Sequence, residues 1–151
     1  MTNRQAFLDM IAFSEIGPAL LAVSDNGYNV LVGSTAAHPL LFDSYADHPN
    51  VLNKACNSTA AGRYQLLHRY WLAYRDMLDL PDFGHDSQDA IALQQIRECH
   101  ALPDIDAGDL YTAVQKCARI WASLPGAGYG QHENKFQSLQ TAYTGAGGTL
   151  A

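Results

Sequence analysis

The sequence lacks any long apolar run. No stretch approaches the roughly 18 consecutive apolar residues of a transmembrane helix, and Asp9 interrupts the apolar segment nearest the N-terminus. A secretory signal peptide needs an unbroken apolar region at that place. We therefore expect no membrane insertion and no signal peptide, and the chain is interpreted as a cytosolic product.

Several catalytic motifs are missing as well. The six histidines form neither an HExxH motif nor an i, i+4 pair, GxSxG is absent, and the three cysteines lack CxxC spacing. A zinc site therefore has little support, and neither a metal nor another cofactor is expected. Cys99 and Cys117 occupy apolar helix positions and are expected to be small core residues outside any disulfide framework. Cys56 has His48 and His68 nearby in sequence, but such neighbours need not meet in space, so a thiol nucleophile is disfavoured.

Positive charge is scarce. The chain has nine Lys and Arg residues and fifteen Asp and Glu residues, which gives a formal net charge of −6. This charge argues against nucleic-acid partners, because phosphates call for a basic surface. Arg63, Arg69 and Arg75 cluster on or near one predicted helix, and we interpret each as a solvated position.

What the chain does contain is typical of a folded globule. With 151 residues, 48% hydrophobic and 10% aromatic, it suits one domain over residues 1–151, large enough to bury roughly two thirds of its unfolded surface. We expect a monomer.

The hydrophobic spacing predicts a mainly helical α+β fold. Thr2 and Gln5 have capping-box spacing, which begins a helix that Gly17-Pro18 stops. Two antiparallel strands are expected over 28–32 and 40–45, followed by a loop from His48 to Ser58. Further helices are expected over 64–78, from Asp86 or Ser87 to 99, over 110–117 and over 136–143.

Glu15 stands out on the first of these helices. Leu8, Ile11, Ala12 and Glu15 fall at i, i+3, i+4 and i+7, one face of a helix, and that face normally turns to the core. Desolvation and the negative end of the helix dipole both disfavour the ionised carboxylate, so its pKa is expected to rise. A carboxyl that stays protonated near neutral pH can serve as a general acid. The alternative is a helix-end glutamate that simply reaches solvent.

Three segments resemble the phage lambda lysozyme family of lytic murein transglycosylases: 58–67, 87–96 and 120–131. The resemblance continues in register from 6–10 to 147–149, and it places Glu15 at the family's catalytic glutamate. It implies a lysozyme-like fold with a small β-hairpin lobe and a helical lobe flanking a cleft. It also implies cleavage of the β-1,4 bond between MurNAc and GlcNAc in peptidoglycan glycan strands, with 1,6-anhydro-MurNAc ends. The resemblance further implies a phage endolysin that acts on periplasmic peptidoglycan after holin-mediated release and lyses the host.

The same resemblance suggests where substrate binds. The segment before Gly62-Arg63-Tyr64-Gln65 would form one lip of the cleft, and the glycine-rich loop 125–130 the other. Tyr64 also belongs to an aromatic stripe on the expected helix over 64–78. Core packing explains most of that stripe, while a ring at the helix start could instead stack on a sugar. The candidate substrate-binding residues are Tyr28, Tyr64, Gln65, Tyr129 and Gln131.

Two departures from the family pattern leave alternatives open. Ile16-Gly17 follows Glu15 where the family usually has Gly-Thr, and Phe13 replaces a tryptophan, so an inactive saccharide-binding module is one alternative. The other is a hydrolytic muramidase, which needs a second carboxylate. Asn29 stands where the family has an aspartate. The residues of this chain that could act as the second carboxylate are Asp25, Asp43 and Asp47.

Overall fold

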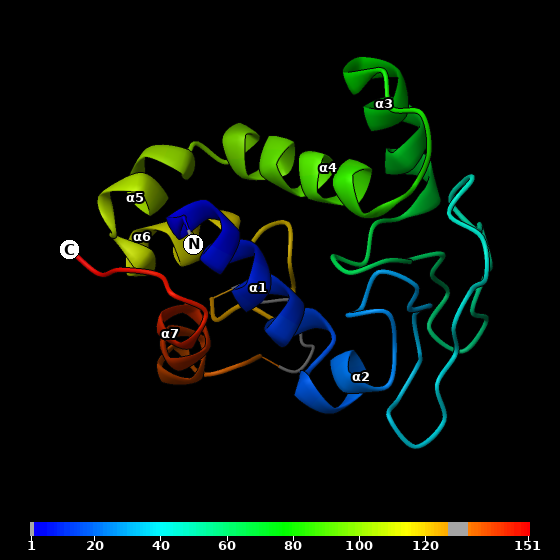
Figure 1. Cartoon of the computed structure of the whole chain (residues 1–151), viewed down its shortest axis with the longest axis horizontal. Coiled ribbons are helices and arrows are strands. Elements are labelled where there is room, and N and C mark those ends of the chain that lie inside the picture. The colour runs from blue at the N-terminus through cyan, green and yellow to red at the C-terminus, as the bar shows by residue number, and fades with distance from the viewer. Residues whose placement is uncertain (1, 127–132) are drawn as a thin grey trace. The chain divides into compact units, whose positions relative to one another are not determined.

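The computed structural model describes residues 2–126 and 133–151 and divides the chain into two compact units. Met1–Glu15 and Ala92–Ala151 form what we call the terminal unit, and Ile16–Ile91 form the middle unit. The terminal unit contains α1 (Asn3–Glu15), α5 (Leu102–Ala107), α6 (Leu110–Cys117) and α7 (Phe136–Gly145). The middle unit contains α2 (Pro18–Ala22) and α3 (His68–Leu78), and α4 (His85–Glu98) runs through the boundary (Figure 1). The expectation of a single domain remains a prediction.

Helix α1 begins and ends where the sequence predicts. The Gln5 amide donates to Thr2 Oγ1 at 3.1 Å, and the Thr2 amide donates to Gln5 Oε1 at 3.0 Å, the reciprocal pair of a capping box. Gly17, with a φ of +87°, stands two residues after the last helical residue, Glu15. Pro18 then starts the short helix α2, which was not predicted. Proline suits a first helical position because its missing N–H has no partner there anyway.

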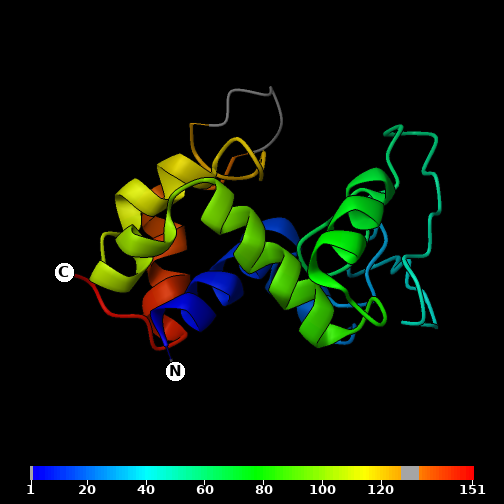
Figure 2. The same cartoon turned by 90° about the horizontal axis from the view of Figure 1, so that it is seen from above.

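The core of the terminal unit forms around α1. Its contacts run to α7 and α5, and α7 lies beside α1 in both views (Figures 1 and 2). Phe7, Met10 and Ile11 on α1 are fully buried, as is Leu139 on α7. Each such side chain contributes about 1.5–3 kcal/mol by leaving water. The helix that carries Glu15 is therefore fixed along its length. Helices α6 and α7 confirm the predicted segments.

The middle unit differs from the predicted hairpin. Residues 23–67 run without a helix longer than a turn (Figure 2). Val30 pairs with Leu41 as an antiparallel bridge, and the Leu31 amide donates to Leu40 O at 2.9 Å, but no continuous strand forms over 28–32 or 40–45 in the described part of the chain. The Tyr28 and Val30 amides instead donate to carbonyls three residues earlier. These turn bonds use the donors that a ladder would need, so the hairpin prediction holds only as isolated pairing.

Tyr64 lies outside the helix to which the sequence assigned it. Helix α3 begins at His68, because Gly62 and Gln65 have φ values of +86° and +53°, which a right-handed helix does not contain. The Gln65 amide donates to Gly62 O at 3.2 Å and closes a turn. Gly62 is also confined in space, since a Cβ there would lie 2.3 Å from Gln88 Oε1.

The core interpretation of the aromatic stripe is confirmed for Trp71 and Tyr74. Both are buried in a cluster with Phe83 and Ile91. Phe83 packs edge-on against Trp71, with ring centroids 5.1 Å apart. Helix α4 starts at His85, slightly before the predicted caps. Asp82 Oδ1 accepts from the Gly84 amide at 2.9 Å and from Ser87 Oγ at 3.2 Å, so the bonds at this helix start converge on Asp82.

Arg63 is buried, so the expectation of a solvated arginine was wrong at this position. It is only 5% exposed, and its guanidinium carbon lies 5.2 and 5.6 Å from the ring centroids of Tyr28 and Tyr64. Nε donates to Asn26 O at 3.0 Å and an NH group donates to the Tyr64 hydroxyl at 3.0 Å. The Arg63 backbone amide donates to Gln88 Oε1 at 2.9 Å. This residue therefore ties together three segments of the middle unit.

The cysteines match the sequence interpretation. Cys99 and Cys117 are buried, Cys56 is exposed, and all three are free thiols. Within the described ranges, no helix is long and apolar enough to cross a membrane. No group of three or more His, Cys, Asp or Glu side chains suited to a metal ion occurs in the same ranges.

A buried histidine makes the stability of the middle unit depend on pH. His48 Nε2 donates to Leu66 O at 2.8 Å, and Nδ1 accepts from the Asn50 amide at 3.0 Å, which together require the neutral ring. Burial lowers the pKa of His48 below its ordinary value. The neutral form is therefore favoured in the folded state, and we expect stability to be lost as pH falls below about 6.5, the ordinary histidine value.

This expectation is tested by urea unfolding between neutral and acidic pH. The difference in unfolding free energy between the parent and His48→Gln should shrink as pH falls, because only the parent has to charge a buried ring. Replacing the exposed His38 by glutamine is the matched control. A parent-to-variant difference that is constant over this range would contradict the prediction.

Candidate active site

Glu15 lies at the end of α1, half-buried, with its carboxyl against a serine from a distant segment. Ser123 Oγ donates to Glu15 Oε2 at 2.5 Å. Ser123 follows α6 and is held by its own backbone, since its carbonyl accepts from the Asn134 amide at 2.8 Å. The first helix and the segments on either side of the glycine-rich loop thus meet at this carboxyl.

Two further polar residues stand behind this contact. Ser14 Oγ lies 2.7 Å from Ser123 Oγ, and Asn134 Nδ2 lies 3.0 Å from Ser14 Oγ. Sequence reasoning missed Ser123, Ser14 and Asn134. Ser14 is the neighbour of Glu15, but no spacing rule connects it with residues more than a hundred positions away.

The electrostatics of Glu15 agree with the sequence expectation. Desolvation raises its pKa, and the hydrogen bond from Ser123 partly offsets that rise. Desolvation dominates because a carboxylate loses the solvation that stabilises its charge. The alternative of a helix-end glutamate that merely reaches solvent is therefore disfavoured, and this side chain can hold a proton for transfer.

Two of the candidate sugar-binding residues are internal. Tyr28 is 8% exposed and Tyr64 is 5% exposed, and their hydroxyls both donate to Asp89 Oδ1, at 2.9 and 2.6 Å. Tyr28 is also covered by the His85 ring, stacked at 3.8 Å between centroids. Neither tyrosine therefore offers a free face for stacking on a pyranose. Their arrangement supports the turn around Arg63 instead.

Gln65 holds the same turn from within. Its Nε2 donates to Gly62 O at 2.8 Å and to Val30 O at 3.3 Å, so its side chain links the turn to the backbone at Val30. The remaining candidates, Tyr129 and Gln131, lie outside the described residues.

The three aspartates proposed as a second carboxylate have different surroundings. Asp25 Oδ2 accepts from the Tyr45 hydroxyl and from His85 Nε2, both at 2.6 Å, and these bonds lower its pKa. Asp47 Oδ1 accepts from Trp71 Nε1 at 2.7 Å, which lowers its pKa as well. Asp43 is exposed. Asp25 and Asp47 thus serve as hydrogen-bond acceptors that fix neighbouring aromatic side chains.

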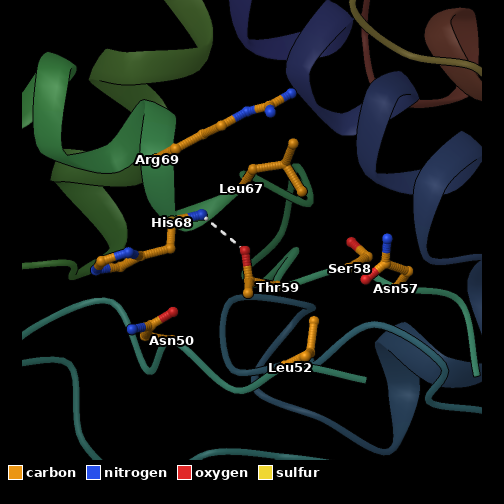
Figure 3. Close-up of a pocket in the computed structure, with 8 residues that line it drawn as sticks. All are labelled: Asn50, Leu52, Asn57, Ser58, Thr59, Leu67, His68 and Arg69. Atoms are coloured by element: carbon orange, nitrogen blue, oxygen red, sulfur yellow. Dashed lines mark hydrogen bonds between the residues drawn. The ribbon is translucent and has the colours of Figure 1, made fainter. Parts of the chain in front are cut away.

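The middle unit has a pocket of about 320 Å³ at the N-terminal end of α3 (Figure 3). The His68 amide at its wall donates to Thr59 Oγ1 at 3.1 Å, which ties α3 to the loop before Gly62. Amide, hydroxyl and guanidinium groups share the wall with the apolar side chains of Leu52 and Leu67, and such a mixed wall suits a hydroxylated ligand. The lining residues are Asn50, Leu52, Asn57, Ser58, Thr59, Leu67, His68 and Arg69.

Comparison with known proteins identifies the family. A family model described as Endolysin matches residues 5–150. The chain belongs to the Endolysin family. It is 52% identical to the endolysin of Escherichia phage lambda, over 98% of this chain and 93% of that protein, and 48% identical to the endolysin of Escherichia phage P2, over 99% and 95%.

Solved structures of this family confirm the fold. Bacteriophage lambda lysozyme complexed with a chitohexasaccharide matches with a TM-score of 0.90 and 52% identity, covering 99% of this chain and 96% of that chain. A second structure of lysozyme from bacteriophage lambda matches with a TM-score of 0.81 and 49% identity, over the same shares. The chain thus has the lambda lysozyme fold, as predicted. The predicted cleft remains a prediction, and the predicted β-hairpin is reduced to isolated bridges in the described residues.

Proposed function

We propose that this endolysin degrades peptidoglycan as a lytic transglycosylase, cutting the β-1,4 bond between MurNAc and GlcNAc. The observation that carries the proposal is Glu15, a desolvated carboxyl with a raised pKa that is oriented by a serine hydroxyl. Family membership supports peptidoglycan as the substrate, and the lambda relative was solved with a chitohexasaccharide, a glycan chain. The surroundings of Glu15 favour an active enzyme over an inactive binding module.

The proposed reaction needs one carboxyl group. Neutral Glu15 protonates the glycosidic oxygen as the bond to C1 of MurNAc breaks, and the N-acetyl carbonyl of the substrate supports the oxocarbenium-like centre. The resulting carboxylate takes the proton of the C6 hydroxyl, whose oxygen attacks C1. Glu15 thereby returns to its protonated form, and the product is a 1,6-anhydro ring formed without water.

A hydrolytic muramidase is the second candidate in the enzyme class. It requires another carboxylate as nucleophile or base. The lowered pKa values of Asp25 and Asp47 keep both ionised, as such a role demands, but both carboxylates already accept hydrogen bonds from side chains within the middle unit. These contacts favour the mechanism with one carboxyl group.

We propose peptidoglycan in the periplasm of the phage's host as the place of action. Holin-mediated release from the cytoplasm is part of this proposal, and rests on family membership alone.

The chemical nature of the released ends tests the proposal. Muropeptides from purified sacculi should resist borohydride reduction at muramic acid and be lighter than hydrolysis products by one water, because C6 attack consumes the anomeric centre. A hydrolytic muramidase is the matched control for reducible ends. Reducible muramic acid as the main product would refute transglycosylation, and binding to sacculi without soluble fragments would show a non-enzymatic module.

A further inference from the structure

The hydrogen bonds behind Glu15 have a direction that can be worked out atom by atom. Asn134 Nδ2 lies 3.3 Å from the backbone carbonyl of Ser14 and 3.0 Å from Ser14 Oγ. A carbonyl oxygen only accepts, so the amide nitrogen, rather than the amide oxygen, must face Ser14. The orientation of the Asn134 side chain is thereby fixed.

The remaining protons follow from this starting point. Ser14 Oγ accepts from Asn134, and its own single proton points to Ser123 Oγ, 2.7 Å away. Ser123 in turn has one proton, and it points to Glu15 Oε2. Each hydroxyl accepts from one neighbour and donates to the next, so all the bonds run toward the carboxyl.

We propose that Ser123 is a positioning residue for Glu15, and that Ser14 and Asn134 set the direction of its hydroxyl so that Oε2 accepts and Oε1 carries the acidic proton. The inference rests on the proposed function in one respect, namely that Glu15 is the acid. A carboxylic acid has one proton to give. If Oε2 carried it, the proton would point into the serine chain, and the carboxyl would have to rotate before transfer to a glycosidic oxygen.

The same geometry predicts how the acid titrates. Burial raises the pKa of Glu15 and the Ser123 hydroxyl lowers it, and no charged group among the described residues contributes to the shift. Removing the hydroxyl should therefore raise the pKa of Glu15 further. The protonated acid then persists to higher pH, and the alkaline limb of the activity profile moves to higher pH. A carboxyl that is held loosely also transfers its proton more slowly.

The first test compares Ser123→Ala with Ser123→Thr. We expect Ser123→Ala to lose about 10-fold to 10²-fold in kcat with KM little changed, as misplacement of a catalytic group does, and its alkaline limb to move to higher pH. Ser123→Thr retains a hydroxyl and should recover most of the rate. Ser87→Ala, which removes a buried hydroxyl in the middle unit, is the structural control and should leave the limb in place. Parental kcat and an unmoved limb in Ser123→Ala would overturn the proposal.

The second test reverses the direction. Asn134→Asp replaces the amide by a carboxylate, which only accepts hydrogen bonds. Ser14 would then donate to this carboxylate, and Ser123 would donate to Ser14. A lone pair of Ser123 Oγ would consequently face Glu15 Oε2. Asn134→Asp should therefore lose more kcat than Asn134→Ala at equal thermal stability. Equal kcat values in these two variants would overturn the assigned direction.

A direct titration separates this inference from the proposed function. The carboxyl carbon of Glu15, observed by NMR in the labelled full chain, should titrate at higher pH in Ser123→Ala than in the parent. This measurement does not depend on activity or on which product is formed. Reducible ends in the sacculus digest would refute transglycosylation alone, whereas an unchanged Glu15 titration would refute the role of Ser123 alone.

Discussion

Glutamine in place of Glu15 is expected to remove lytic activity, lowering the rate by about 10² to 10⁴, the usual contribution of general acid–base catalysis. The reason is chemical, because an amide cannot deliver a full proton to a leaving alkoxide. The two side chains have nearly the same shape, and the glutamine oxygen can still accept from Ser123 Oγ. The measurement is the initial rate of turbidity loss with purified sacculi.

Stability measurements on the same variant show whether the fold is intact. A carboxyl whose folded pKa is raised loses stability as pH increases from its ordinary value of 4.5 toward the folded value. Glu15→Gln lacks this loss, so we expect it to melt at a higher temperature than the parent at neutral pH, with a smaller difference in acid. A folded variant with a rate within a few-fold of the parent would remove Glu15 from the mechanism.

Arg63→Ala is expected to destabilise the protein by about 3 kcal/mol. The change removes the charge-assisted bonds to Asn26 O and the Tyr64 hydroxyl, each worth about 1.5–3 kcal/mol. It also removes a cation from between two aromatic rings, and opens a cavity where its stem packs. The variant has no buried charge to desolvate, and this offsets part of the loss. The expected destabilisation is therefore smaller than the sum of the lost interactions.

Urea unfolding at neutral pH measures this effect. Arg63→Lys keeps the charge but not the planar fork of donors, and should show an intermediate loss. Arg69→Ala is the matched control, because Arg69 is exposed and stacks on its neighbour Tyr70. That change is expected to stay within about 0.5 kcal/mol of the parent, as surface substitutions usually do. Equal unfolding free energies for the Arg63 and Arg69 variants would contradict the role assigned to Arg63.

The features that depend on residues close in sequence were predicted correctly. The capping box at Thr2 and the stop at Gly17-Pro18 depend on neighbours within a few positions, and helical spacing alone placed Glu15 toward the core. The structure confirms the bounds of α1, and the burial of its last residue raises the pKa of that carboxyl.

Other features could not be predicted because they arise from tertiary contacts. Ser123 and Asn134 are 108 and 120 positions away from Glu15 and Ser14, their respective partners. The stripe through Tyr64 had helical spacing, but the left-handed backbone at Gln65 overrode it. Arg63 gave no sign of burial either, since only the folded turn supplies the rings and carbonyls that compensate a buried charge.

The confined glycine at position 62 has an evolutionary consequence. The space that a Cβ would need is filled by the Gln88 side chain, which also donates to the carbonyls of Tyr28 and Phe83 at 3.1 and 2.9 Å. A larger residue at 62 needs a smaller side chain at 88 and is still strained by the φ of +86°, and a smaller residue at 88 abandons those carbonyls. Substitutions at the two positions should therefore show strong epistasis. Mutational drift through either position alone leads first to a less stable protein, and a change at 88 that opens the space still leaves the backbone strain at 62.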